Sequence, residues 1–146
     1  MDTPAFDSSP DPDKPGWLNW QMTDASRYNG TVLGKMLVRS EGDNKARLRM
    51  YPEHRHSNLR NAVHGGVTLG FIDVAMFGAS RMFGLIEAGA AVTLDLSVQF
   101  IGAGVIGATT VGALGFSAER AVAEVRLFKL AHASETRNTC PYCSVG

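Results

Sequence analysis

Residues 61–80 read NAVHGGVTLGFIDVAMFGAS. This stretch predicts one helix that is buried on most of its sides, and the rest of the predicted fold is built around it. Its apolar residues, followed to about Gly84, point in nearly all directions of a helical wheel. They are Val67, Leu69, Phe71, Ile72, Val74, Met76, Phe77 and Met82. Asp73 is the single charged residue of the quoted stretch. A buried carboxylate costs several kcal/mol unless it is paired, so Asp73 needs a partner or a function.

Segments on both sides of this helix alternate apolar and polar residues, which indicates strands. Residues 28–42 and 44–54 flank the turn-forming Glu41–Asn44 and predict a β-hairpin with one buried face. Residues 91–100, AVTLDLSVQF, show the clearest alternation in the chain. Residues 53–66 are polar and Gly-punctuated and predict a surface loop, while Trp17, Leu18 and Trp20 predict an apolar anchor. This order of elements predicts an α+β domain in which a sheet wraps one central helix.

Size and charge narrow the classes of function. The 146 residues suit one domain, and the formal net charge is zero without a Lys or Arg run, which argues against nucleic acid as a partner. Residues 1–16 are rich in Pro, Asp and Ser and predict a flexible leader, not a signal peptide. We therefore expect a cytoplasmic protein. The uncharged run 96–118 is too rich in Gly and Thr for a membrane span.

The dipeptide Gly65-Gly66 after His64 falls where the helix is predicted to begin. The first N–H groups of a helix have no partner within it, and a glycine there lets a carbonyl oxygen approach them. This arrangement can stabilise an oxyanion. Gly65 and Asp73 would be separated by about 12 Å along one helix, too far for one small reacting group. If the two residues cooperate, they come from different subunits of a homodimer.

The runs His56-Ser57-Asn58 and Asn61–Gly66, followed by Asp73, resemble the signature of hotdog-fold acyl-CoA thioesterases of the phenylacetate-pathway (PaaI-like) group. The resemblance covers about residues 17–105. It implies a hotdog fold, an antiparallel sheet wrapped around one central helix. It also implies hydrolysis of an acyl-CoA thioester to a free acid and CoA, in a homodimer or homotetramer, without a cofactor or metal.

The resemblance also implies roles for five residues. Gly65 would polarise the thioester carbonyl through its N–H, and Asp73 of the facing subunit would act as base or nucleophile. Asn58 and His64 would hold the loop and the water or carbonyl, and Thr93 would position the attacking water. His56 is predicted to be a solvated loop residue. An aryl and a medium-chain acyl group remain equally compatible with Phe71, Met76, Phe77 and Met82, which could also be plain core.

The last part of the chain, about residues 106–146, resembles a second family. Residues 108–116, ATTVGALGF, and 137–146, RNTCPYCSVG, are similar to the signal and first cluster-binding cysteines of the catalytic subunit of respiratory formate dehydrogenase. Cys140 and Cys143 supply two of the four thiolates that an iron–sulfur cluster needs. A CxxC pair can also bind zinc or form a local disulfide, but we expect these two cysteines to hold nothing. A junction at about 100–108 is one interpretation. The other is that 109–118 and 121–131 supply the missing strands.

The predicted function is that of an acyl-CoA thioesterase. Two alternatives remain: a non-catalytic hotdog module that binds acyl-CoA, and a chimeric fragment of an iron–sulfur and molybdopterin oxidoreductase leader. Hydration of an enoyl thioester is a rival reaction in the same fold, but the spacing from the glycines to Asp73 favours hydrolysis.

Overall fold

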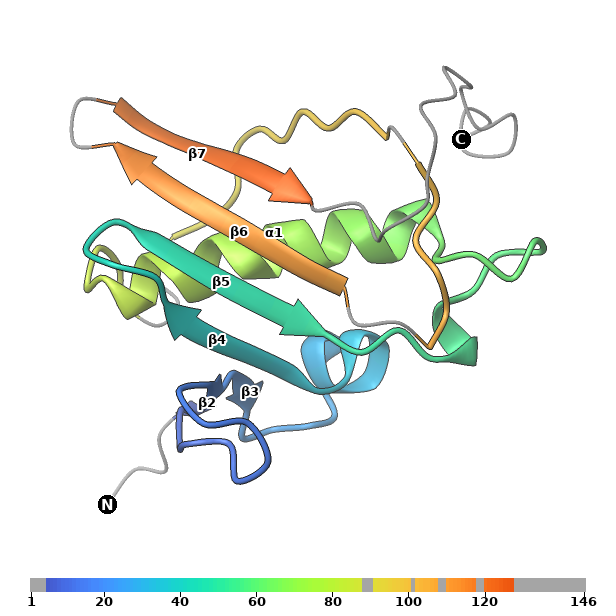
Figure 1. Cartoon of the computed structure of the whole chain (residues 1–146), viewed down its shortest axis with the longest axis horizontal. Helices are drawn as coiled ribbons and strands as arrows, with labels where there is room; N and C mark the ends of the chain where they lie inside the picture. The colour runs from blue at the N-terminus through green and yellow to red at the C-terminus, as the bar shows by residue number, and fades with distance from the viewer. Residues whose placement is uncertain (1–4, 88–90, 101, 108–109, 118–119, 128–146) are drawn as a thin grey trace.

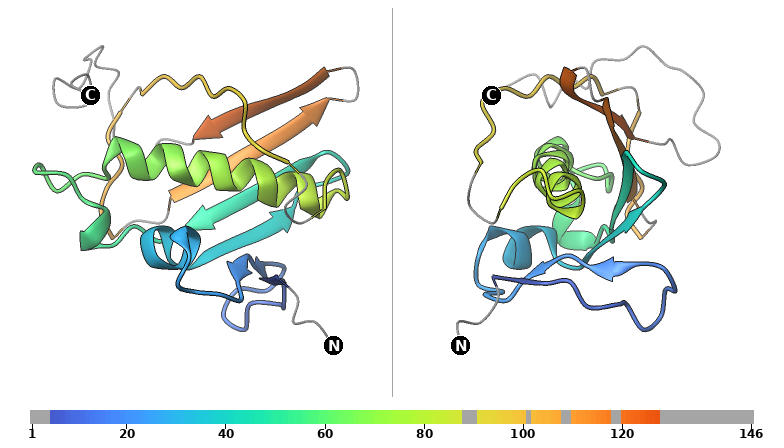
Figure 2. Two further views of the ribbon diagram at one scale, coloured as in Figure 1. Left: turned by 180° about the vertical axis from the view of Figure 1, so that it is seen from behind. Right: turned by 90° about the vertical axis from the view of Figure 1, so that its left-hand side faces the viewer.

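One long helix lies against one face of a five-stranded antiparallel sheet (Figure 1). The computed structural model describes residues 5–87, 91–100, 102–107, 110–117 and 120–127. The sheet order is β2-β4-β5-β6-β7, and the sheet curves around helix α1 (Figure 2). The bounds are β2 Leu18–Asn19, β4 Met36–Ser40, β5 Lys45–Met50, β6 Thr110–Ser117, β7 Arg120–Leu127 and α1 Gly65–Met82. This architecture confirms the predicted α+β class.

Strands β4 and β5 form the predicted hairpin around the turn at Glu41–Asn44. Residues with even numbers face the helix, and Met36, Val38, Leu48 and Met50 are each no more than 2% exposed. Side chains of a strand alternate between its two faces, so the odd-numbered Arg39, Arg47 and Arg49 lie on the outer face of the sheet. The hairpin prediction extended too far at its start. Residues Asn29–Leu33 form a helical turn, η1, instead of a strand.

Strands β6 and β7 complete the sheet. Strand β6 pairs with β5 from Met50↔Thr110 to Lys45↔Gly115, and β7 pairs with β6 with a register shift between Gly115 and Ser117. Strands β6 and β7 overlap the segments 109–118 and 121–131, which one of the two interpretations of this region expected to supply strands. Cys140 and Cys143 lie outside the described residues.

Helix α1 is the predicted central helix. Its buried residues are Phe71, Ile72, Val74, Ala75, Gly78 and Ala79, and all of them lie on one broad side of the helix. That side packs on the inner face of β4, β5 and β6. Gly78 lets α1 approach the sheet closely, because a Cβ at this position would lie 2.8 Å from Leu48 Cδ2 and 3.1 Å from Trp20 Nε1. The opposite side of the helix, which carries Gly66, Asp73 and Phe77, is less buried.

The prediction of a strand at residues 91–100 is wrong. This segment is extended chain that pairs with no strand of the described part of the sheet (Figure 1). Thr93 and Leu94 are exposed, and Leu94 is 93% exposed. Alternation of apolar and polar residues indicates an amphipathic segment, but a strand also needs a neighbour for its backbone N–H and C=O groups.

The prediction of a flexible leader over residues 1–16 does not describe residues 5–16. Strand β1, Phe6–Asp7, pairs with β3, Gln21–Met22, and the Phe6 ring stacks on Trp20 with 4.7 Å between ring centroids. Asp11 is buried and forms an ion pair with Lys35, with 2.6 Å from Oδ2 to Nζ. The hydrogen-bonded ammonium of Lys35 lowers the pKa of Asp11, and the same contact raises the pKa of Lys35. Contacts with residues that are distant in sequence therefore hold residues 5–16 in place.

Within the described residues, no helix is both long enough and apolar enough to cross a membrane.

Candidate functional site

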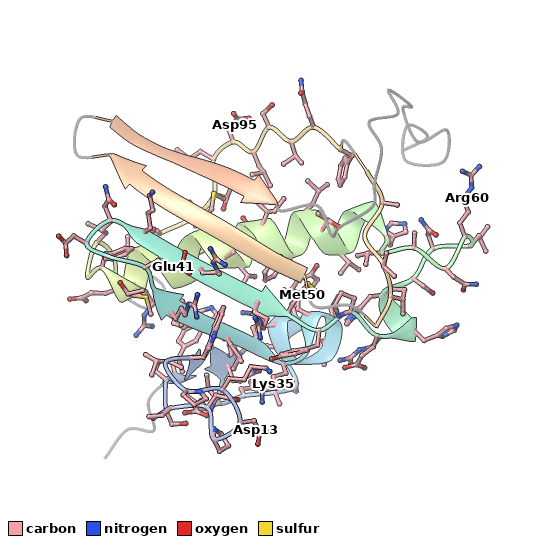
Figure 3. The ribbon with its side chains drawn as sticks, viewed as in Figure 1. Asp13, Lys35, Glu41, Met50, Arg60 and Asp95 are labelled. Carbon is pink, nitrogen blue, oxygen red and sulfur yellow. The ribbon has the colours of Figure 1, made fainter. Side chains whose placement is uncertain are left out.

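Asn58 makes hydrogen bonds within the loop before α1. The Asn58 side-chain oxygen accepts hydrogen bonds from the N–H of Arg60 at 2.9 Å and of Ala62 at 3.2 Å. Its own backbone N–H donates to the carbonyl of Ala62 at 2.8 Å. Arg60 lies at the tip of this loop and points away from the molecule (Figure 3). Asn58 therefore shapes the turn that delivers the chain to the start of the helix.

His64 is the N-cap of α1. Its backbone is extended, with φ −65° and ψ 138°, and its Nδ1 accepts a hydrogen bond from the N–H of Gly66 at 3.0 Å. The cap uses one of the free donors of the first helical turn. Gly65, the first helical residue, is half-buried and carries no side chain that could cover its own N–H. The predicted oxyanion position is thus the first turn of a well-capped helix.

The expectation that His56 is solvated is wrong, since its side chain is only 1% exposed. Its Nδ1 accepts from the N–H of Glu53 at 2.8 Å, and its Nε2 lies 2.6 Å from the carbonyl oxygen of Val32. When Nδ1 of a neutral imidazole accepts a hydrogen bond, the ring proton is on Nε2. The Nε2–H of His56 can then donate to the Val32 carbonyl. The His56 carbonyl in turn accepts from the N–H of His64 at 2.8 Å. His56 is therefore a buried support of the loop.

A second support comes from the chain after residue 100. The N–H of Val63 donates to the carbonyl of Gly104 at 3.0 Å, and Ala62 forms an antiparallel bridge with Val105. The approach to α1 is therefore held on one side by His56 and on another by residues 104–105. Backbone fixed from two sides keeps a donor such as the Gly65 N–H in one orientation, which is what electrostatic preorganisation requires.

Asp73 and Thr93 lie in contact in the structure. The Thr93 hydroxyl donates a short hydrogen bond to Asp73 Oδ1, which ties α1 to the segment 91–100. Asp73 is half-buried on the side of α1 that faces away from the sheet, and Thr93 is exposed. One oxygen of the Asp73 carboxylate is thereby engaged.

Gly65 and Asp73 lie on the same straight helix, so within one chain they are separated by about 12 Å along its axis. The structure therefore gives two half-sites in one chain. The first consists of the loop residue Asn58 with His64 and Gly65, and the second consists of Asp73 and Thr93.

An open pocket of about 280 Å³ adjoins the second half-site, between the last two turns of α1 and the segment that begins at Ala91. Thr93 lines it. Of the four residues proposed for an acyl pocket, Met76 and Phe77 line it, whereas Phe71 is core. Met82 packs against the core cluster. Sequence reasoning missed Ser80 and Ile86, because nothing in a linear pattern says which segment will cover a helix.

Tyr28 was also missed. Its hydroxyl reaches α1 at Gly70, where it occupies the space that a Cβ would take, although the residue as a whole is 50% exposed. Gly70 precedes Asp73 by three residues and lies on the same side of the helix. The sequence pattern placed Tyr28 at the start of the strand predicted for residues 28–42 and gave no sign of a contact with the helix.

Among the residues that the structure describes, no three His, Cys, Asp or Glu side chains gather in a way that could hold a metal ion.

Comparison with known proteins agrees with this geometry. Residues 61–128 match the Thioesterase superfamily. The match begins in the loop before α1 and ends just after β7, so it includes both half-sites except Asn58. Together with a curved antiparallel sheet around one central helix, it identifies the fold as a hotdog fold and confirms that prediction.

A 44-residue stretch matches two proteins of Escherichia coli (strain K12): the major subunit of the nitrate-inducible formate dehydrogenase and the formate dehydrogenase-O major subunit. Identity is 57% in both cases, over 30% of this chain and 4% of each subunit. The resemblance to a formate dehydrogenase is thus confirmed for a short stretch. The chain therefore spans only a very small part of these subunits.

Among solved structures, thioesterase superfamily member 2 from Mus musculus is similar, with 24% identity and a TM-score of 0.47. The similarity covers 58% of this chain and 60% of that protein.

Proposed function

We propose that this protein is an acyl-CoA thioesterase of the PaaI-like group, which hydrolyses a thioester to a free acid and CoA. The observation that carries the proposal is the half-buried Asp73 carboxylate, which accepts a hydrogen bond from Thr93 on the open side of a helix that begins with His64 and two glycines. The match of residues 61–128 to the Thioesterase superfamily supports it.

The reaction needs both half-sites at one thioester, so the active unit is a homodimer with two sites related by a twofold axis. In each site the N–H of Gly65 donates to the thioester carbonyl oxygen and stabilises the negative charge that develops there. Asp73 of the partner subunit removes a proton from a water molecule as the water oxygen attacks the carbonyl carbon. The C–S bond then breaks, and the CoA sulfur leaves as a thiolate that takes up a proton.

The remaining residues position these groups. Asn58 and His64 hold the loop and the first helical turn, so that the Gly65 N–H has a fixed direction. The Thr93 hydroxyl holds one oxygen of Asp73 and leaves the other toward the water. No nucleophilic serine is required, because a thioester lacks much of the resonance that protects an ester.

Replacement of Asp73 by Asn tests the proposal. The amide keeps the shape and can still accept from Thr93, but it cannot remove a proton, so we expect kcat to fall by about 10²- to 10⁴-fold. Hydrolysis of acetyl-CoA, hexanoyl-CoA and phenylacetyl-CoA would be followed by release of free thiol. Size-exclusion chromatography and circular dichroism show whether the variant keeps its fold and assembly.

Asp43→Asn is the matched control, because Asp43 is an exposed carboxylate in the hairpin turn. Full activity of the Asp73→Asn protein would rule out Asp73 as the base. Tight binding of acyl-CoA without hydrolysis by the natural sequence would instead identify a non-catalytic binding module.

A further inference from the structure

Tyr28 presents its hydroxyl group to the open side of α1. A Cβ added to Gly70 would overlap with this hydroxyl, and it would lie 3.2 Å from Cζ and 3.4 Å from Cε1 of the same ring. The absence of a side chain at Gly70 is therefore what lets the phenol reach the helix backbone. Tyr28 is 50% exposed, so its ring lies at the surface of the single chain and not in the core.

The hydroxyl of Tyr28 is available to bind water. The Tyr28 backbone carbonyl accepts from the Thr31 hydroxyl at 3.5 Å, but the phenol hydroxyl has no hydrogen-bond partner among the groups that the structure describes. A phenol has one proton to donate and an oxygen that accepts. A hydrogen bond from such a group to an ordered water is nearly as favourable as one within the protein.

Asp73 directs its carboxylate toward the same turn of the helix. Side chains of an α-helix tilt toward its N-terminus, so the side chain of residue 73 covers the turn that contains residues 69 and 70. Gly70 precedes Asp73 by about 4.5 Å along the axis. Thr93 contacts the carboxylate from the segment 91–100, which lies on the other flank of α1 from η1 (Figure 2). The phenol and the carboxylate therefore border one place on the helix, where a single water molecule can contact both.

The element that carries Tyr28 is held by the loop that also positions the first half-site. Tyr28 is the N-cap of η1, and Leu33 at the end of η1 is fully buried. The carbonyl oxygen of Val32 lies 2.6 Å from His56 Nε2. The backbone carbonyl of His56 accepts from the N–H of His64, the cap of α1. The position of the phenol is thus coupled to that of the helix start.

In the proposed dimer this place lies inside the interface. If Gly65 of each chain faces Asp73 of the other, the twofold axis passes nearest to residue 69, midway between them. Gly70 and the Tyr28 hydroxyl lie beside that point. The partner chain then shields a water at this position from bulk solvent, and hydrogen bonds are electrostatically stronger in such surroundings.

We propose that Tyr28 is a further catalytic residue, whose hydroxyl oxygen accepts a hydrogen bond from the attacking water. The water gives one proton to Asp73 of the same chain and directs its other proton to Tyr28, while its oxygen forms a bond to the thioester carbon. The second proton stays on the new hydroxyl group as the C–S bond breaks and the sulfur leaves as a thiolate. With both protons directed, the lone pairs of the water face the carbonyl carbon. The inference rests on the proposed function for the thioester and for the role of Asp73.

Tyr28→Phe removes the hydroxyl and keeps the ring. With acetyl-CoA, hexanoyl-CoA and phenylacetyl-CoA as substrates, we expect kcat to fall by about three- to tenfold, the equivalent of one hydrogen bond, and KM to stay unchanged. Gly70→Ala should lower kcat by a similar factor, because its Cβ takes the place of the hydroxyl. Tyr51→Phe is the matched control. It removes the same atom from a half-buried tyrosine directly after β5 and should change neither constant.

A double-mutant cycle separates catalysis from support of the fold. If Tyr28 acts on the water that Asp73 deprotonates, Tyr28→Phe should lower the residual rate of the Asp73→Asn protein by less than about twofold. An equal loss in both backgrounds would show that the hydroxyl only supports the fold and would overturn the assignment.

The outcomes also separate this inference from the proposed function. Unchanged kcat in both Tyr28→Phe and Gly70→Ala, together with loss of activity in Asp73→Asn, would remove Tyr28 from the mechanism and leave the thioesterase standing. A natural sequence that hydrolyses none of the three thioesters would overturn both.

Discussion

Asp73 and Thr93 show how a residue far along the chain completes a site. They are separated by twenty positions, and the contact between them depends on how the segment after α1 folds back on the helix. The sequence pointed to Asp73 through its spacing from the HGG motif and to Thr93 through the family resemblance. It could not do the same for His56, because the polar run around this residue is typical of a surface loop. Its burial depends on the carbonyl of Val32, which lies twenty-four positions earlier.

The ion pair between Asp11 and Lys35 predicts a dependence of stability on pH. Because the pKa of Asp11 is lowered in the folded state, its stabilising effect is complete above the ordinary value of about 3.9 and is lost as the pH falls through the folded pKa. The pKa of Lys35 is raised in the folded state, so the stabilising effect of this ammonium is lost at alkaline pH, as the pH rises through its folded-state pKa.

We therefore expect Asp11→Asn to lower the melting temperature at pH 7 and to have progressively less effect below pH about 4. Melting followed by circular dichroism from pH 2 to pH 8 would measure this difference. Asp43→Asn, which changes an exposed turn carboxylate, should follow the natural sequence at every pH. A constant gap between Asp11→Asn and the natural sequence down to pH 2 would contradict the assignment.

Gly70 and Gly78 both lie in α1, but an added Cβ would meet different surroundings at the two positions. A Cβ at Gly78 would press on Leu48 and Trp20, both buried, whereas at Gly70 it would meet only the hydroxyl end of the half-exposed Tyr28. Alanine favours a helix over glycine by about 1 kcal/mol, and overpacking of a core costs about 1–3 kcal/mol.

Gly78→Ala should therefore lower the free energy of unfolding by up to about 2 kcal/mol, whereas Gly70→Ala should leave it unchanged or raise it by as much as about 1 kcal/mol. Urea titration of both variants, followed by circular dichroism, measures the two values side by side. Equal stability of the two variants would mean that α1 does not need the close approach at Gly78.

Strands were predicted correctly where several independent features of the sequence agreed, and wrongly where only one feature indicated a strand. The hairpin of β4 and β5 had alternation, a Gly-containing turn and β-branched or long apolar residues, and its inward residues were predicted correctly. The segment 91–100 had alternation alone. Periodicity describes the faces of a segment but not its neighbour, so it could not reveal that this chain covers α1 without joining the described sheet.

At the scale of the whole molecule, the proposed function requires two chains, and this can be tested by mixing inactive variants. Gly65→Pro removes the N–H that would polarise the carbonyl, and proline suits the first position of a helix after the extended His64. Gly65→Pro and Asp73→Asn should each be inactive.

Co-expression of the two variants should restore activity to about a quarter of the natural level, because half of the dimers are mixed and each mixed dimer has one intact site. Thiol release by the purified mixture measures the recovery, with each variant expressed alone as the reference. No recovery in a mixture shown by mass spectrometry to contain mixed dimers would place both residues of a site in one chain.

The two ends of the chain show what composition could not predict. The Pro- and Asp-rich start was predicted to be flexible, yet Phe6 and Asp11 find partners at Trp20 and Lys35. The later part of the chain resembles a formate dehydrogenase subunit in its sequence motifs, and β6 and β7 in this part pair into the sheet beside β5. Both outcomes depend on contacts with distant residues, which local composition does not encode.

The two tryptophans of the chain lie on opposite faces of the sheet. Trp17 packs under the guanidinium groups of Arg39 and Arg49, at 4.8 Å and 4.5 Å from its ring centroid, while Trp20 belongs to the core beneath Phe6. Intrinsic fluorescence therefore reports the docking of the N-terminal segment on both faces of the sheet. An emission change on heating that precedes the loss of helical ellipticity would mark the release of this segment while α1 and its carboxylate are still in place.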